Sequence, residues 1–149
     1  MVSMSNLSQL LEPETRSLVL KDLSQFVDKT VAEQSGISGM AIKGAVSAAT
    51  KVSPDFISRG LNKILPDMLG DLEPYWSDFE SSDSQDFGAF LDKDSAAVAD
   101  ALMSTADQHA ERITIAPVAK AYKSLRNKGA SIVEGKVADL GSILHKHMD

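Results

Sequence analysis

Residues 36–52 read Gly-Ile-Ser-Gly-Met-Ala-Ile-Lys-Gly-Ala-Val-Ser-Ala-Ala-Thr-Lys-Val, a run in which almost every residue is apolar or small. If the run is a helix, the polar residues of its body recur at i, i+4, i+7 and i+8 and share one narrow face. These residues are Lys43, Ser47, Thr50 and Lys51. A helix with so little polar surface is expected to be surrounded by other elements. We therefore predict a central buried helix at residues 38–52, around which the rest of the chain packs.

The segments on both sides carry the apolar spacing of amphipathic helices. Apolar residues recur at helical spacing from Val19 to Val31, which predicts a helix over about residues 13–34. The same spacing predicts helices over about residues 86–92, 95–112 and 117–147. No alternating β-branched run and no hairpin turn indicates a strand. The predicted fold is all-α, a single-domain multi-helix bundle of about six to eight helices that spans residues 1–149.

Two helices contain residues that oppose helix formation. Residues 54–80 keep helical register through Pro66, which removes a backbone hydrogen bond and clashes with the preceding turn. We predict two helices here, about residues 54–65 and 66–80, with one continuous kinked helix as the alternative. Near the C-terminus, Gly129 costs about 1 kcal/mol relative to Ala in a helix interior. We therefore predict a break or a kink of the helix over residues 117–147 at Asn127–Gly129.

Composition restricts the compartment and the class of protein. The 149 residues include no cysteine, which excludes disulfides, thiolate metal ligands and a cysteine nucleophile and favours a reducing compartment. Residues 1–6 do not have the pattern of a secretory signal. No apolar run reaches the about 20 residues that a membrane-spanning helix needs. We expect a cytoplasmic protein with no membrane segment.

The net charge of -6 is unevenly distributed along the chain. Residues 67–111 contain twelve acidic residues and a single basic one, Lys93, whereas residues 112–149 are mainly basic. One interpretation is that the two segments are neighbours in the fold, or that both are simply solvated surface. The other is that molecules associate, for example as a homodimer, through attraction between the acidic segment of one and the basic segment of the other. The overall acidity disfavours a nucleic-acid partner.

The residue types that carry catalysis or bind metals do not form a recognisable motif. His145 and His147 are two residues apart, so one helix cannot direct both at one metal ion. The segment from Asp83 to Asp94 lacks the side chains that a calcium loop requires at its third and fifth positions. The chain has no phosphate-binding glycine motif and no serine nucleophile motif. We therefore predict no catalytic, cofactor-binding or metal-binding residues; His109, Asp100 and Arg126 are the one set that an enzyme hypothesis would use.

Two small groups of residues have both a structural and a functional interpretation. Lys43 and Lys51 are either extended lysines at the bundle surface or contacts for an anion. Tyr75, Trp76 and Phe79 are close in sequence within the acidic segment. They either fill the core or form a partner surface with an acidic rim, because Trp and Tyr are frequent anchors of interfaces.

Short stretches along nearly the whole chain resemble a known family. They are Gly36-Ile37-Ser38-Gly39, Ala41-Ile42-Lys43-Gly44-Ala45, Lys51-Val52, Pro54-Asp55, Leu65-Pro66-Asp67, Pro74, Trp76, Asp78-Phe79, Phe87-Gly88, Val98-Ala99-Asp100-Ala101-Leu102, Tyr122 and Ser124-Leu125-Arg126. With these stretches the chain resembles an uncharacterised family of small all-helical actinobacterial proteins, a domain of unknown function. The resemblance implies a helical fold in a bacterial cytosol, and it implies no activity.

Two classes of function are consistent with these observations. The first is a non-enzymatic interaction or structural module that associates with itself or with a protein partner. The alternative is a protein that binds an apolar small molecule in a pocket inside the bundle, since helical bundles hold ligands between their helices.

Overall fold

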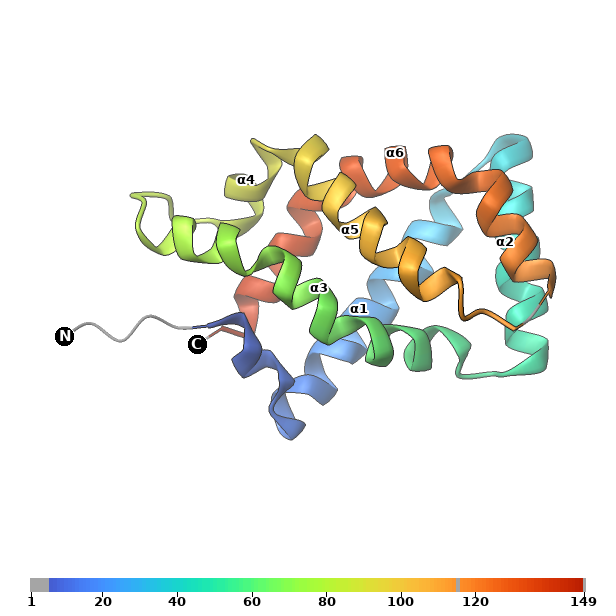
Figure 1. Ribbon diagram of the computed structural model, residues 1–149, viewed down its shortest axis with the longest axis horizontal. Helices are drawn as coiled ribbons and strands as arrows, with labels where there is room; N and C mark the ends of the chain where they lie inside the picture. Colours follow the sequence, from blue (N-terminus) through green and yellow to red (C-terminus); the bar gives the residue numbers. More distant parts are fainter. Residues whose placement is uncertain (1–5, 115, 149) are drawn as a thin grey trace.

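The computed structural model describes residues 6–114 and 116–148, which form six α-helices and one short 3-10 helix. In chain order they are η1 (Leu7–Leu11), α1 (Pro13–Glu33), α2 (Gly36–Val52), α3 (Phe56–Glu80), α4 (Phe87–Asp92), α5 (Ser95–Ala110) and α6 (Ala116–Lys146). Figure 1 shows a bundle with α2 at one end and the loop between α3 and α4 at the other. The described residues contain no β-strand. The prediction of a single-domain all-α bundle is confirmed.

Helix α3 contributes more buried residues to the core than any other helix, because its large apolar residues recur on one face. Six of them are buried in the core: Leu65, Met68, Leu69, Leu72, Trp76 and Phe79. Full burial of such a side chain stabilises the fold by about 1.5–3 kcal/mol. Helix α3 packs against η1, α1, α2, α4 and α5, so the core forms around this helix.

The predicted central position of residues 38–52 is wrong. These residues are helical within α2, but α2 lies at the edge, mainly against α6 (Figure 1). Gly39 and Ala49 are its only buried residues, whereas Ile37, Met40 and Val52 are 89%, 75% and 69% exposed. The physical reason is side-chain size. A run of Ala and Gly has little apolar area to remove from water, so enclosing it gains less than enclosing the large residues of α3.

Helix α3 continues through Pro66, and another helix supplies a hydrogen-bond donor at this point. Proline has no backbone N–H, so Pro66 leaves the carbonyl of Asn62, four residues earlier, without its helical partner. The Nη2 atom of Arg16, on α1, donates to this carbonyl at 2.7 Å. The Nε atom of Arg16 also donates to the side-chain Oδ1 of Asn62, at 2.8 Å. The continuous helix, which was the alternative to two helices, is therefore the correct one.

Helix α6 is also continuous, so of the two alternatives predicted at Asn127–Gly129 the break is wrong. Figure 1 shows α6 curving along the bundle, from α2 to the end where η1 lies. The helix packs against α4, α5, α2 and α1. Contacts with four helices outweigh the helix-forming penalty of one glycine, which is about 1 kcal/mol.

Helix α4 approaches α6 closely at a pair of glycines. A Cβ atom on Gly88 would lie 2.3 Å from the carbonyl oxygen of Ala138 and 2.5 Å from Oγ of Ser142. A Cβ atom on Gly141 would lie 2.7 Å from Cα of Gly88. Neither glycine has a positive φ, so the requirement for glycine here is steric and not conformational.

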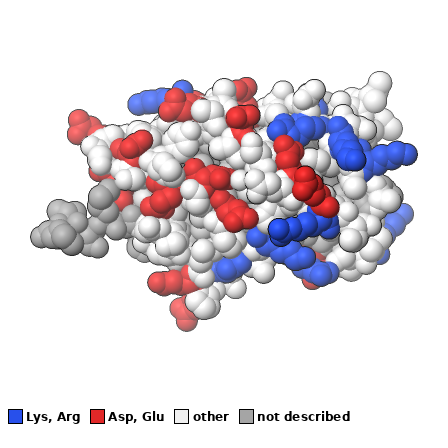
Figure 2. All heavy atoms as spheres, in the orientation of Figure 1, with Lys and Arg blue, Asp and Glu red and all other residues white. Residues whose placement is uncertain are grey.

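Charge is separated along the molecule. On α3 the basic residues Arg59 and Lys63 precede Pro66, and only acidic charges follow it. Figure 2 shows most Lys and Arg over the end that carries α2 and most Asp and Glu toward the opposite end. Within residues 6–114 and 116–148, no helix has the length and apolar character that crossing a bilayer requires.

Candidate functional site

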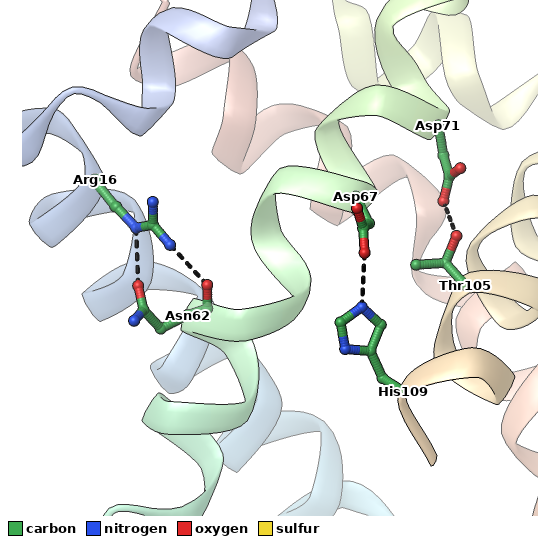
Figure 3. A network of polar contacts seen from close by, with 6 residues as sticks. All are labelled: Arg16, Asn62, Asp67, Asp71, Thr105 and His109. Atoms are coloured by element: carbon green, nitrogen blue, oxygen red, sulfur yellow. Dashed lines mark hydrogen bonds and ion pairs between the residues drawn. The ribbon is translucent and has the colours of Figure 1, made fainter. Parts of the chain in front are cut away.

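Two polar pairs join α3 to α5 in antiparallel register. Oδ2 of Asp67 lies 2.8 Å from Nε2 of His109, and one turn further along α3 the hydroxyl of Thr105 donates to Oδ2 of Asp71 (Figure 3). Each helix contributes residues at i and i+4, which lie on one face. The two pairs connect the middle of α3 to the second half of α5.

An open cleft of about 830 Å³ lies between the first turns of α3 and the C-terminal end of α5. Its apolar lining includes Phe56 and Ile57 from α3, and Ile113 from the segment between α5 and α6. The charged residues in the described lining are three bases and no carboxylate: Arg59, Lys63 and Arg112. The cleft therefore combines an apolar wall with a cationic rim.

One side of the cleft is held by a polar cluster between α5 and α6. The Tyr122 hydroxyl donates to Oδ1 of Asp107 at 2.6 Å, and Nε of Arg126 donates to the same atom at 2.8 Å. The hydrogen bond from Arg126, and then that from Tyr122, lowers the pKa of the Asp107 carboxyl below its usual value. Burial, followed by the bond to Asp107, raises the pKa of Tyr122 well above its usual range. Asp107 thus remains ionised at neutral pH and Tyr122 remains protonated.

A second pocket, of about 260 Å³, lies between α1, α3, α5 and α6. Its lining is apolar except for three residues, Thr30, Thr105 and Lys136. Each of these is occupied within the protein: Thr30 donates to the Phe26 carbonyl at 2.7 Å, Thr105 donates to Asp71, and Lys136 donates to Glu33 at 3.0 Å. Like the cleft, this pocket is open to solvent, and because its accessible surface is almost entirely apolar it favours apolar groups over water.

The two pockets are adjacent. Val27, Leu61, Ile64 and Ala106 line both of them. These four residues come from α1, α3 and α5, the helices that the contacts in Figure 3 connect. The apolar pocket and the cationic cleft are therefore separated by no more than these shared side chains.

The aromatic residues that the sequence suggested as a partner surface lie mainly in the core. Trp76 is 3% exposed and Phe79 is 7% exposed, while Tyr75 is half-buried. The ring of Trp76 meets that of Phe87 edge to face, with the centroids 4.8 Å apart. Trp76 and Phe79 therefore cannot form a partner surface together with Tyr75. Burial of their large rings beneath α4 is more favourable than exposure to solvent.

Lys43 and Lys51, the suggested anion contacts, are exposed on α2. Neither lysine lines the two pockets described above. Lys51 directly precedes Val52 and Ser53, which line the cleft. A role of the two lysines in anion binding stays a prediction.

The histidines are held by different partners. Nδ1 of His145 accepts from the backbone N–H of Phe87 at 3.4 Å. Nε2 of His147 lies 2.7 Å from Oδ2 of Asp22, and this hydrogen bond is the main cause that lowers the pKa of the Asp22 carboxyl. No group of three or more His, Cys, Asp or Glu side chains with metal-binding geometry occurs in the described part of the chain.

The three residues of the enzyme hypothesis, His109, Asp100 and Arg126, do not pair with one another. His109 pairs with Asp67, and Arg126 pairs with Asp107. Asp100, the third member of the set, is exposed. A nucleophile held by a base, which an acyl-transfer or hydrolytic site requires, is not among these pairs.

Comparison with known families gives one match that covers almost the whole chain. Residues 7–148 match the model of a family of unknown function, DUF6918. The chain belongs to this family. The expected resemblance to an uncharacterised domain is therefore confirmed, and the match covers every helix of the bundle. No curated protein and no solved structure matches the chain.

The sequence did not indicate the cationic cleft. Arg59 and Lys63 are an i, i+4 pair on α3, whereas Arg112 follows α5 and is far from them in the chain. Their common position depends on the antiparallel packing of α3 on α5. The one usable signal was the change from basic to acidic residues along α3, at Pro66.

Proposed function

We propose that this protein binds an apolar small molecule in the pocket between α1, α3, α5 and α6. The supporting observation is that the polar residues of its lining, Thr30, Thr105 and Lys136, already have hydrogen-bond partners within the protein. The volume of about 260 Å³ exceeds that of an engineered apolar cavity of about 150 Å³ that binds benzene. Two of the lining residues, Met68 and Met103, are flexible and adapt well to different ligand shapes.

The first experiment uses a neutral apolar dye, N-phenyl-1-naphthylamine, whose fluorescence rises in apolar surroundings. We expect saturable binding to the wild-type protein. Ala106→Phe places a ring where the two pockets meet and is expected to abolish binding. Ala97→Phe, on an exposed position of the same helix, is the matched control and is expected to bind as wild type does.

A second measurement does not depend on how the variants fold. In wild-type protein with isotope-labelled methionine methyl groups, the dye is expected to shift the NMR signals of Met68 and Met103. Met40 lies exposed on α2 and is the internal control. Absence of saturable dye binding, or shifts confined to Met40, would overturn the proposal.

We infer a second candidate function, self-association through α2, from its exposed apolar residues. Ile37, Met40 and Val52 are the large side chains of this surface, and each is more than two-thirds exposed, at 89%, 75% and 69%. The occupant considered is a second copy of the chain. Light scattering coupled to size exclusion is expected to give twice the chain mass for wild type and the single mass for Met40→Glu. A single mass for wild type at all concentrations contradicts this candidate.

A further inference from the structure

The cationic rim indicates which class of apolar molecule the pocket accepts. We propose that the ligand is a single-chain anionic amphiphile, with its alkyl chain in the apolar pocket and its anionic head in the cleft at Lys63 and Arg112. This inference rests on the proposed function, because it assigns the head group of a ligand whose apolar part occupies the pocket.

The first argument is the balance of charge in the cleft. Arg59, Lys63 and Arg112 are the charged residues of its described lining. Arg59 is partly neutralised, because its Nη1 lies 4.0 Å from Oδ1 of Asp55. Among the described residues, the side chains of Lys63 and Arg112 form no ion pair. Two unpaired cations therefore face the opening of an apolar site.

The second argument is that the nearby carboxylates are already occupied. Asp67 pairs with His109, which lines the cleft. Asp107 receives hydrogen bonds from Tyr122 and Arg126. Neither carboxylate is in the cleft lining, so a ligand anion bound there would meet cations and no competing carboxylate of the described lining.

The third argument is the shape of the combined site. The apolar pocket, at about 260 Å³, is slightly smaller than the about 300–1,000 Å³ of most ligand pockets. Its volume and apolar lining accommodate a single alkyl chain. Because Leu61, Ile64 and Ala106 line both pockets, a chain that begins in the apolar pocket leads directly to the rim. An alkyl chain with one terminal anion matches both parts of the site.

The test compares three ligands that share one chain: dodecanoate, dodecyl phosphate and the neutral dodecanol. Isothermal titration calorimetry on wild type is expected to show both anions binding about tenfold more tightly than dodecanol, since one charge-assisted contact contributes roughly that factor. In Lys63→Gln/Arg112→Gln this preference is expected to disappear while dodecanol binding is unchanged. Lys21→Gln/Lys93→Gln removes the same charge outside the two pockets and is expected to keep the preference.

The outcomes separate this inference from the proposed function. Equal binding of dodecanol and the anions by wild type, or a preference that persists in Lys63→Gln/Arg112→Gln, overturns the assignment of the head group and leaves apolar binding intact. Failure of dodecanol and of the neutral dye to bind overturns the proposed function itself. Flotation with phosphatidylglycerol vesicles distinguishes the source of the anion. Vesicle binding without dodecanoate binding would overturn the inference in favour of a membrane headgroup.

Discussion

The contact between Arg16 and the helix turn at Pro66 gives the sharpest prediction about stability. The guanidinium makes two hydrogen bonds to Asn62, at 2.7 Å to the backbone carbonyl and 2.8 Å to the side-chain oxygen. The carbonyl is the one that Pro66 leaves without a helical donor (Figure 3 shows both bonds). In Arg16→Ala both bonds are lost, and α3 loses the donor that offsets the proline.

The magnitude follows from the exposure of the contact. A hydrogen bond to a charged group contributes about 1.5–3 kcal/mol when well formed, but exposed charged pairs contribute about 0–1 kcal/mol. Both bonds to Asn62 are exposed, and the released carbonyl can bind water. We therefore expect Arg16→Ala to lower the free energy of unfolding by about 1 kcal/mol, which is about 2–4 °C in Tm for a chain of this size.

A double-mutant cycle with Pro66→Ala tests whether Arg16 stabilises α3 by replacing the hydrogen bond that Pro66 removes. The Pro66→Ala substitution restores a backbone N–H that can bond to the carbonyl of Asn62, so the loss caused by Arg16→Ala is expected to fall to about half in that background. Urea unfolding followed by circular dichroism measures all four proteins. Lys29→Ala, on an exposed position of the same helix as Arg16, is the control and is expected to stay within about 0.5 kcal/mol of wild type. An equal loss from Arg16→Ala with and without Pro66 would refute the explanation.

Three further predictions concern other parts of the fold. Gly88→Ala is expected to destabilise the protein by about 1–3 kcal/mol through overpacking against α6, whereas Gly135→Ala, with open space around it, is expected to stabilise it by about 0.5–1 kcal/mol; urea unfolding distinguishes them. Met40→Ser is expected to change unfolding by no more than about 0.5 kcal/mol, and a loss of about 2 kcal/mol or more would mean that α2 is buried after all. Because the hydrogen bond from His147 lowers the pKa of Asp22 in the folded state, this carboxylate stabilises the fold above its unfolded pKa of about 4, and the contribution is lost as the pH falls through the folded pKa. Asp22→Asn is therefore expected to flatten the acid side of a stability-against-pH curve, and an unchanged curve would contradict the role of this pair.

Periodicity in the sequence was sufficient to identify the helices. The apolar spacing from Val19 to Val31 on α1, and that of α5, depends only on neighbours one turn away. The same local information could not decide how the helices continue. Pro66 and Gly129 are locally unfavourable, and both are tolerated because distant residues compensate: Arg16 in the first case, and packing of α6 on four other helices in the second.

The sequence by itself determined an all-α chain, the extent of α1 and α5, and the absence of a catalytic or metal-binding motif. Only the tertiary structure decided that α3 is central and α2 peripheral, because burial depends on the area of each side chain and not on the number of apolar letters. It also decided that Lys63 and Arg112 line one cleft, which is adjacent to an apolar pocket. Lys63 and Arg112 are far apart in the chain and share a site only because α3 packs on α5. This packing cannot be predicted from a local sequence pattern.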